Sequence, residues 1–309
     1  MAKIITLTLN PALDKSIEVP ELVPEKKLRS LNVKVEPGGG GINVSRALHK
    51  LEGNSEAVYL SGGFTGKQFE KLLAEEGISS VALNIQGDTR ENFIVVDAKS
   101  NLQYRFGMEG PAVDENEWQQ TLDHISKQND ISYIVASGSL PQGVPVDFFG
   151  RLAIIANQKN AKLIADTSGE PLQHAVQEGL FMIKPNLDEL ATLNGKKELD
   201  HEEIISAARK IINSGGCEVM VVSMGKDGAI LITAKENIQV KPPPVKVNST
   251  IGAGDSMVAG MVLALSKNWK WEAVLRYGVA AGTSATMNHG TELCKKEDTD
   301  QMFEKMKPE

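Results

Sequence analysis

The sequence predicts an α/β protein: a doubly wound, mainly parallel sheet with helices on both faces and a small antiparallel β lid outside it. Between about residues 131 and 234, short continuous apolar runs alternate with helix-like patterns, which is typical of parallel strands buried on both faces. Polar residues follow these strands where they end. Two further stretches, at 15–36 and 92–106, break the alternation and are typical of extended strands.

The alternating elements can be assigned in order. We expect strands at 131–136, 161–166, 180–184 and 218–223, and helices over the pattern at 148–156 and at 171–178, 187–193 and 202–213. Crossovers between parallel strands are right-handed, and ligands bind beyond the carboxyl ends of such strands. Polar segments lie at these ends, at 137–139, 166–169, 184–186 and 223–225. We therefore expect the functional site along this edge.

The two extended stretches predict the lid. The first contains Pro20 and Pro24, and the second forms a hairpin pattern, 93–97 and 102–106, around a turn at 99–101. A small sheet with one apolar face has to cover something, so it is either a lid over the site or a dimer contact. We expect a single domain over 1–309, with the lid formed by about 12–36 and 89–107.

Composition excludes several classes of protein. The formal net charge is −7, with 41% hydrophobic and 24% charged residues, which argues against nucleic acid or an anionic membrane as partner. Cys217 and Cys294 are the only cysteines, too few for a disulfide framework or a zinc site. The first residues form a strand pattern and not a signal peptide, and no apolar run approaches about 20 residues. We expect a cytoplasmic protein.

Common catalytic motifs are missing. The sequence contains no GxxxxGK[ST] phosphate loop, no GxGxxG opening a helix after a strand, no HExxH and no GxSxG. A phosphate or metal site of those types is therefore excluded.

Residues 248–257 carry the strongest positive signal. Gly252 and Gly254 are followed at once by Asp255 and then by an apolar helical pattern. The start of a helix presents unpaired N–H groups and the positive end of the helix dipole, which attract phosphate. Asp255 would stand there as a base, although an acid at this position is equally typical of a helix cap.

A second glycine-rich helix start lies near the N-terminus. Four glycines at 38–41 precede an apolar helical pattern, with Asn43 in its first turn. Such glycines let a ligand contact the backbone, and Asn43 can hydrogen-bond a hydroxylated ligand. The alternative is a flexible turn, but four glycines carry an entropy cost that a plain turn rarely needs.

These two motifs, GGGGINVSRAL and NSTIGAGDSMVAG, resemble the two signatures of the ribokinase-like PfkB family of carbohydrate kinases. KPNLDEL and SMGKDGA resemble further family segments, and the likeness covers essentially the whole chain. Within the family, VPEKKLRS, EPGGGGINVSRA, SGSLPQGV and KPPPVKVNSTIGAGDSM resemble the minor-type ATP-dependent 6-phosphofructokinases most. TLNPALD is similar to 1-phosphofructokinases and tagatose-6-phosphate kinases as well.

The resemblance implies the roles of the catalytic residues. Asp255 would take the proton from the sugar hydroxyl, and the helix N-terminus would favour its ionised form. The N–H groups of Gly252, Ala253 and Gly254 would hold charge on the transferring phosphoryl group.

The resemblance also implies how the sugar phosphate is held. Asp14 and Asn43 would bind sugar hydroxyls, beside Gly38, Gly39 and Ser139. Four cations in or next to the lid would hold the existing phosphate: Lys27, Arg29, Arg90 and Arg105. Taken singly, each of these is equally typical of an exposed charge on an edge strand.

Nucleotide and metal residues follow in the same way. The implied nucleotide-binding residues are Lys184, Asn186, Ser223, Gly225, Val279, Gly282 and Thr283, and Glu189 would hold Mg²⁺ through water. Helix capping is the alternative for Asn186 and Glu189, and packing through small residues is the alternative for the last three. A K⁺ site is implied at Ser249, Ile251, Asn288 and Gly290, but Glu292 stands where near relatives often have a basic residue, which leaves the potassium requirement open.

The implied activity is ATP-dependent phosphorylation of fructose 6-phosphate in glycolysis, with Mg²⁺ and a homodimer formed through the lid. Tagatose 6-phosphate and fructose 1-phosphate are the alternative acceptors, because one chain does not determine hydroxyl configuration or phosphate position. A non-enzymatic sugar-phosphate sensor is the competing class. Asp255 favours the enzyme, since a sensor needs no base beside two anion-binding glycines.

Overall fold

The main sheet has nine strands and is mainly parallel, as predicted. The computed structural model describes residues 2–306, and the strand order is β13-β12-β11-β10-β9-β8-β1-β4-β5. All pairs from β11 to β5 are parallel, whereas β11–β12 and β12–β13 are antiparallel. The strands are β1 (Lys3–Thr8), β4 (Glu56–Ser61), β5 (Ser80–Asn84), β8 (Ile131–Ser137), β9 (Lys162–Asp166), β10 (Leu180–Ile183), β11 (Cys217–Ser223), β12 (Ala229–Thr233) and β13 (Asn237–Val240).

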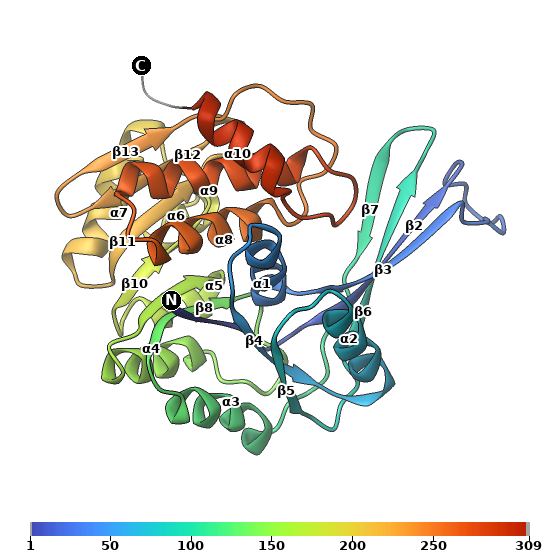
Figure 1. Ribbon diagram of the computed structural model, residues 1–309, viewed down its shortest axis with the longest axis horizontal. Helices are drawn as coiled ribbons and strands as arrows, with labels where there is room; N and C mark the ends of the chain where they lie inside the picture. The colour runs from blue at the N-terminus through green and yellow to red at the C-terminus, as the bar shows by residue number, and fades with distance from the viewer. Residues whose placement is uncertain (1, 307–309) are drawn as a thin grey trace.

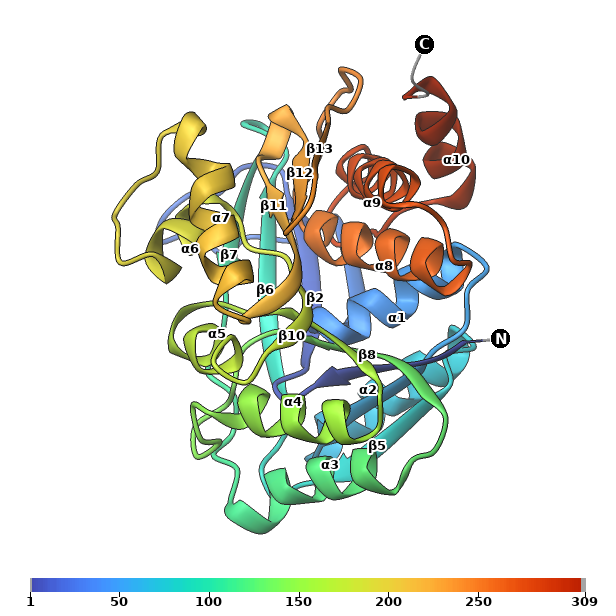
Figure 2. The same cartoon turned by 90° about the vertical axis from the view of Figure 1, so that its left-hand side faces the viewer.

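Helices cover both faces of this sheet (Figures 1 and 2). One face packs against α1 (Gly40–Lys50), α2 (Gly63–Glu75), α8 (Ala253–Ser266) and α9 (Trp271–Thr286), with α10 (Lys296–Lys305) on α9. The other packs against α3 (Glu115–Lys127), α4 (Phe148–Gln158), α5 (Gly169–Ala175), α6 (Leu187–Leu193) and α7 (Ile204–Asn213). Within residues 2–306, no helix combines the length and hydropathy of a bilayer-spanning segment.

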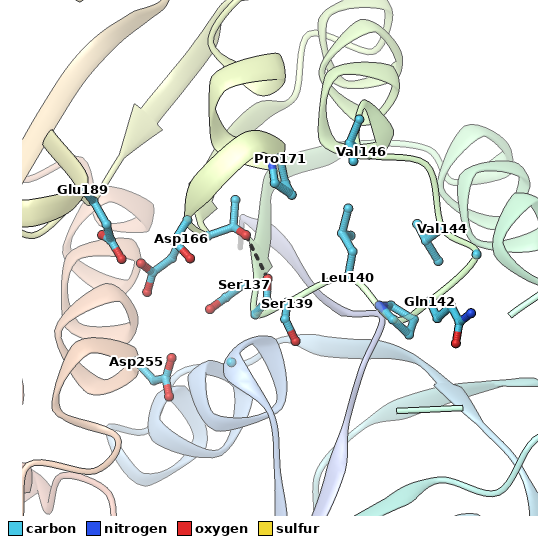
Figure 3. A pocket seen from close by; sticks show the side chains of 16 residues that line it. Ser137, Ser139, Leu140, Gln142, Val144, Val146, Asp166, Pro171, Glu189 and Asp255 are labelled. Carbon is cyan, nitrogen blue, oxygen red and sulfur yellow. Dashed lines mark hydrogen bonds between the residues drawn. The ribbon is translucent and has the colours of Figure 1, made fainter. Parts of the chain in front are cut away.

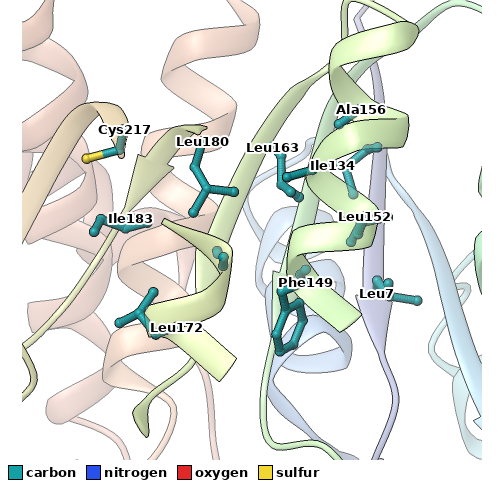
Figure 4. Packing of buried hydrophobic residues seen from close by; sticks show 14 of the residues in the cluster. Leu7, Ile134, Phe149, Leu152, Ala156, Leu163, Leu172, Leu180, Ile183 and Cys217 are labelled. Carbon is teal, nitrogen blue, oxygen red and sulfur yellow. The ribbon is translucent and has the colours of Figure 1, made fainter. Parts of the chain in front are cut away.

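The core on the second face shows why the sheet is stable. Figure 4 shows Leu7 and Ile134 of the sheet beside Phe149 and Leu152 of α4, and all four side chains are buried. Each large apolar side chain that leaves water on folding contributes about 1.5–3 kcal/mol. This packing holds the strand ends, and with them the site, in fixed positions.

Two predicted helices differ in their bounds. The helix expected at 171–178 begins at Gly169 and ends at Ala175, because residues 176–178 continue as a turn that closes at Gly179 with φ 74°. The helix expected at 202–213 is interrupted: a 3₁₀ turn, His201–Glu203, precedes α7. A capping box between Asp200 and Glu203 stabilises that separate turn.

The lid is a four-stranded sheet that projects from one end of the molecule (Figure 1). Its order is β3 (Asn32–Gly38), β2 (Ala12–Val19), β6 (Arg90–Asp97) and β7 (Leu102–Phe106). The outer pairs are antiparallel, but the expectation of a fully antiparallel lid is wrong, because β2 and β6 are parallel. Both strands leave the main body side by side and run outward together, while β3 and β7 are the returning partners.

The two faces of the lid differ in character. Strand alternation places Asp14, Asn92 and Arg105 on one face, because Asp14 pairs with Asn92 and Arg105 with Ile94. The register aligns two rows on the opposite face, which are apolar apart from Lys15: Val33-Ile17-Val95-Tyr104 and Val35-Lys15-Phe93-Phe106. Val33 is 66% and Phe106 52% exposed. This face is therefore an apolar surface open to solvent.

Candidate active site

A cavity of about 610 Å³ lies at the carboxyl ends of the central strands (Figure 3). Ser139, Glu189 and Asp255, all expected at the site, line it together with Ser137 and Asp166. The cavity therefore lies at the sheet edge where the sequence places the polar segments.

The two glycine-rich helix starts meet at this cavity. Gly252, with φ 70°, precedes α8, whose first turn carries Asp255. Gly39, with φ 114°, precedes α1, whose first turn carries Asn43. Asn43 Nδ2 donates to Asp255 Oδ2 at 2.9 Å. Residues 212 positions apart in the chain thus form one site.

The four-glycine run is a packed helix start and not a flexible turn. A Cβ at Gly40 would lie 2.1 Å from Ser137 Oγ and 2.8 Å from the backbone N of Gly138. Only glycine lets α1 approach the end of β8 this closely. The same close approach brings Asn43 within reach of α8.

Burial dominates the electrostatics of Asp255. Burial and the nearby carboxylate of Asp166 raise the pKa of Asp255 to about 6, although hydrogen bonds from Asn43 and Ser137 and the charge of Lys184 act in the other direction. Removal of the carboxylate from water on burial is the largest cause of the raised pKa. That the helix N-terminus favours the ionised form of Asp255 stays a prediction. Above about pH 6 the group is ionised and can accept a proton.

Lys184 is a buried cation beside the cavity, paired with Asp166, which lines it. Its side chain is buried and its Nζ lies 3.1 Å from Asp166 Oδ1. Burial opposes the charge, but Asp166, Asp255 and Glu189 together raise the pKa of Lys184. A Cβ at Gly254 would lie 3.5 Å from Lys184 Nζ. The ammonium group therefore lies beside the start of α8, where a transferring phosphoryl group would be held.

Asp166 and Ser137 were not among the expected site residues. Asp166 ends β9 and pairs with Lys184, and Ser137 ends β8 beside Asp255. Their position at the carboxyl ends of strands was a usable signal, but the sequence did not show which polar end residue faces the cavity.

The other nucleotide-site candidates lie on neighbouring strand ends. Asn186 and Ser223 form a parallel bridge, and Gly225, with φ 57°, begins the next 3₁₀ turn, Gly225–Asp227. Asn186 and Glu189 form a capping box at the start of α6, with Glu189 Oε2 accepting from Asn186 N at 2.9 Å and Asn186 Oδ1 from Glu189 N at 2.8 Å. Capping, the alternative for this pair, is therefore present, and Glu189 lines the cavity as well.

The three candidates on α9 face its packing partner. Val279 and Thr283 are buried, and the Thr283 hydroxyl donates to Val279 O at 2.7 Å. A Cβ at Gly282 would lie 3.1 Å from Ala253 O. Gly282 thus packs against the start of α8, Val279 and Thr283 are buried on the same helix, and a contact of any of them with adenine stays a prediction.

The residues expected to bind K⁺ lie in two adjacent loops, before α8 and after α9. Ser249 Oγ donates to Gly290 O at 2.7 Å, and Ile251 N donates to Ser249 Oγ at 3.2 Å. Asn288 Nδ2 donates to Leu293 O at 3.0 Å.

Three N–H groups at the start of α8 are expected to hold charge on the phosphoryl group. One of them, the N–H of Ala253, has a 3.4 Å contact with Thr250 O.

The sugar side of the site is built around Asp14. Asn92 Nδ2 donates to Asp14 Oδ1 at 2.9 Å, and a Cβ at Gly38 would lie 2.1 Å from Asp14 Oδ2. Burial raises the pKa of Asp14, although Asn92 and Arg90 act in the other direction. Ser139 Oγ accepts from Asn10 Nδ2 at 3.2 Å.

The four expected phosphate-binding cations are not all brought together. Arg90 lies at the base of the lid and donates to Met108 O at 2.9 Å and to Asn10 O at 3.0 Å; its Nε is buried without a hydrogen-bond partner in the described part of the chain. Arg105 is exposed on β7. Lys27 and Arg29 are exposed on the loop between β2 and β3, which forms the far tip of the lid (Figure 1).

Comparison with known proteins agrees with this geometry. The sequence profile of the pfkB family carbohydrate kinases matches residues 7–298. The ATP-dependent 6-phosphofructokinase isozyme 2 of Escherichia coli is 41% identical over 304 residues, which cover 98% of each chain. The 1-phosphofructokinase of Bacillus subtilis is 32% identical, again over 98% of each chain.

A solved structure is similar over the whole fold. The crystal structure of phosphofructokinase-2 from E. coli in complex with potassium has a TM-score of 0.96 and 41% identity, and the match covers 99% of each chain. The family profile and these relatives span nearly all of the chain. The chain therefore belongs to the pfkB family of carbohydrate kinases.

Proposed function

We propose that this kinase transfers the γ-phosphoryl group of ATP to the 1-hydroxyl of fructose 6-phosphate. The observation that carries the proposal is the contact of the two glycine-rich helix starts, through Asn43 and Asp255, at one cavity. The choice of acceptor rests on relatives named ATP-dependent 6-phosphofructokinase at 39–41% identity.

Asp255 is the proposed general base. As the sugar oxygen attacks the γ-phosphorus, the new P–O bond forms, the bond to the β,γ-bridging oxygen breaks and ADP leaves. The hydroxyl proton passes to the Asp255 carboxylate, which is ionised above about pH 6. The first N–H groups of α8 and the Lys184 ammonium stabilise the charge of the transferring group.

ATP and Mg²⁺ are proposed to bind beyond the carboxyl ends of β10 and β11, next to the cavity. Lys184, Asn186, Ser223 and Gly225 lie close together there, and Glu189 is the proposed residue that holds Mg²⁺ through water. The donor set fits, because Glu189 and Asp166 both present carboxylate oxygen to one cavity, and Mg²⁺ prefers a few carboxylates and retained water. When bound, the ion supplies charge neutralisation on the phosphates.

A monovalent cation is proposed between the loops before α8 and after α9. The available donors there are hydroxyl, amide and backbone carbonyl oxygens of Ser249, Ile251, Asn288 and Gly290, which suit a weakly charged ion. A potassium complex of a relative with 41% identity supports this assignment.

A homodimer through the lid is proposed for two reasons. The outer face of the lid exposes Val33, Leu102 and Phe106, and exposed apolar patches of this kind mark interaction sites. Lys27 and Arg29 also lie at the tip of the lid, so a sugar phosphate at Asp14 meets them only if a partner subunit brings its own tip across.

The oligomeric state is measured by sedimentation equilibrium. Phe106→Asp places a charge on the apolar face, and the expected result is a monomer. Gln103→Asp, on the opposite face of the same strand, is the matched control and should leave the dimer intact. A wild-type monomer contradicts the proposal. A relative has also been described in a tetrameric inhibited form.

The acceptor is tested in a coupled ADP-release assay. Fructose 6-phosphate, tagatose 6-phosphate, fructose 1-phosphate and unphosphorylated fructose are compared by kcat/KM. We expect fructose 6-phosphate to be the best acceptor. A higher kcat/KM with fructose 1-phosphate would instead favour the activity named for the 32% identical relative. Binding of the sugar phosphate without turnover by the wild type would support the sensor.

A further inference from the structure

A buried charged network lies outside the lining of the cavity and is not part of the proposed chemistry. At its centre is Glu36, near the end of lid strand β3, which is 8% exposed. Its Oε1 accepts from Arg46 NH2 at 3.1 Å, and its Oε2 lies 3.1 Å from Lys34 Nζ. The same Oε2 accepts a hydrogen bond from the hydroxyl of Thr291. One carboxylate thus joins β3 and α1 to Thr291, which lies 255 positions further along the chain.

On the sugar side, the network holds the backbone that precedes the glycine run. Arg46 NH1 donates to Pro37 O at 2.9 Å, and Arg46 Nε and NH2 each donate at 2.7 Å to Glu76, the C-cap residue of α2. Arg46 lies one turn after Asn43 on α1. Pro37 is followed directly by Gly38, which contacts Asp14. A shift of Glu36 would therefore move the backbone against which Asp14 packs.

On the phosphate side, the loop between α9 and α10 contains Thr291 and also contacts the residues that precede α8. A Cβ at Gly252 would lie 2.6 Å from Leu293 Cδ2, and Ser249 Oγ donates to Gly290 O at 2.7 Å. Gly252 precedes α8, at whose start the phosphoryl group is proposed to bind. The loop therefore touches the phosphoryl end of the site at one side and the lid strand at the other.

A second, exposed link runs parallel to the first. Glu292 Oε1 lies 3.3 Å from Lys34 Nζ, which also pairs with Glu36. Thr291 and Glu292 thus both reach β3, from adjacent positions of the loop. Burial would raise the pKa of Glu36, but the Thr291 hydrogen bond and the charges of Arg46 and Lys34 lower it. The carboxylate stays ionised and keeps all its partners at neutral pH.

We propose that Thr291 is a positioning residue that couples the nucleotide side of the site to the sugar side, with Glu292 as its auxiliary. The coupling passes from Gly252 through the loop at 288–293 to Glu36, and from there to Gly38 and Asp14. Ordering of the loop by nucleotide then orders the lid strand, so that nucleotide and sugar phosphate bind more tightly together than apart. The proposal rests on the proposed sugar-phosphate kinase activity.

The test measures binding and not turnover. Calorimetry gives the Kd of fructose 6-phosphate with and without a non-hydrolysable ATP analogue and Mg²⁺, and the ratio of the two values is the coupling factor. In the wild type we expect a factor of at least about 5, the lower end of ordinary coupling energies. Thr291→Val removes the donor with almost no change of shape and should bring the factor close to 1. Thr291→Ser restores the hydroxyl and should restore the factor.

Further variants separate coupling from stability. Glu292→Gln should lower the factor partially, because Lys34 keeps its contact with Glu36. Lys34→Met removes the contacts of Lys34 with both Glu36 and Glu292. It provides the test if Thr291→Val does not fold. Lys196→Met is the matched control: the Lys196–Glu203 pair has side-chain exposures of 48% and 40%, against 48% and 41% for Lys34–Glu292, and its loss should not change the factor.

Two results overturn the proposal: a wild-type factor of 1, or an undiminished factor in both Thr291→Val and Lys34→Met. Coupling between two ligands is reciprocal, so the sugar phosphate must lower the Kd of the ATP analogue by the same factor. A different factor for the analogue also counts against the proposal. Failure of the wild type to turn over fructose 6-phosphate refutes the proposed function instead. In that case the calorimetry is repeated with the acceptor that is turned over, and the coupling is judged there.

Discussion

Asp255→Asn should make the protein more stable at neutral and alkaline pH while it removes the proposed base. The pKa of Asp255 is raised from 3.8 to about 6 by burial and by Asp166. A carboxyl group with a raised folded-state pKa binds its proton more tightly in the folded protein, so its ionised form opposes folding. The cost is fully present above the folded pKa and disappears below the unfolded pKa.

The magnitude follows from the shift. About two pH units at 1.36 kcal/mol each correspond to about 3 kcal/mol. This value is an upper bound, because the carboxyl group lines an open cavity and is partly exposed. Asparagine keeps an acceptor for the Asn43 side chain, and Lys184 keeps its partner Asp166. We therefore expect Asp255→Asn to raise the free energy of unfolding by about 1–3 kcal/mol at about pH 8.

The assay is urea unfolding of wild type and variant between about pH 4 and pH 8, with a thermal melt alongside. The difference in the free energy of unfolding should shrink as the pH falls through about 6 and approach zero near pH 4. For a chain of this length the melting temperature should rise by about 2–6 °C at the alkaline end. A variant that is less stable than the wild type at pH 8, or a difference that does not change with pH, would refute the reasoning.

Three further outcomes are expected. The kcat/KM of the wild type should fall about tenfold per pH unit below about pH 6, since the proposed base must be ionised; a flat profile down to pH 5 contradicts this. Lys27→Ala and Arg90→Ala should each raise the sugar-phosphate KM about tenfold or more and the ATP KM much less, because each removes a charged hydrogen bond. A larger rise in the ATP KM than in the sugar-phosphate KM would contradict the assignment of both residues to the sugar phosphate. Gly38→Ala places a Cβ 2.1 Å from Asp14 Oδ2 and should raise the sugar-phosphate KM in steady-state kinetics. Gly107→Ala is the control, because its Cβ has no neighbour closer than 4.0 Å, and should leave this KM unchanged. Equal effects of the two variants would argue against the contact between Gly38 and Asp14.

Much of the fold could be predicted from local patterns. Strands such as β8 and β9 are short, apolar and flanked by helices, so period and length identify them. The bounds of α5 and the 3₁₀ turn before α7 could not be predicted, because they depend on local capping and on a left-handed glycine. The parallel pairing of β2 with β6 is a long-range choice. It is determined by where both strands leave the main body, which no local pattern records.

The site was predicted less evenly. Asp255 and Asn43 could be found because glycines mark a helix start that must approach something closely. Asp166 and Ser137 could not be chosen from other strand-end residues without knowing which side chain faces the cavity. The raised pKa of Asp255 depends on burial and on Asp166, 89 positions away by sequence number. This burial and this charge interaction exist only in the folded protein.

The central claim is that Asp255 supplies a proton acceptor, while other residues select the sugar. The most direct test compares Asp255→Asn with the wild type by kcat/KM for fructose 6-phosphate and by calorimetric binding of the same sugar phosphate. We predict a loss in kcat/KM of about 10² to 10⁴, the usual contribution of a general base, with a sugar-phosphate Kd within about twofold of the wild type. Equal losses in turnover and in binding would contradict the account.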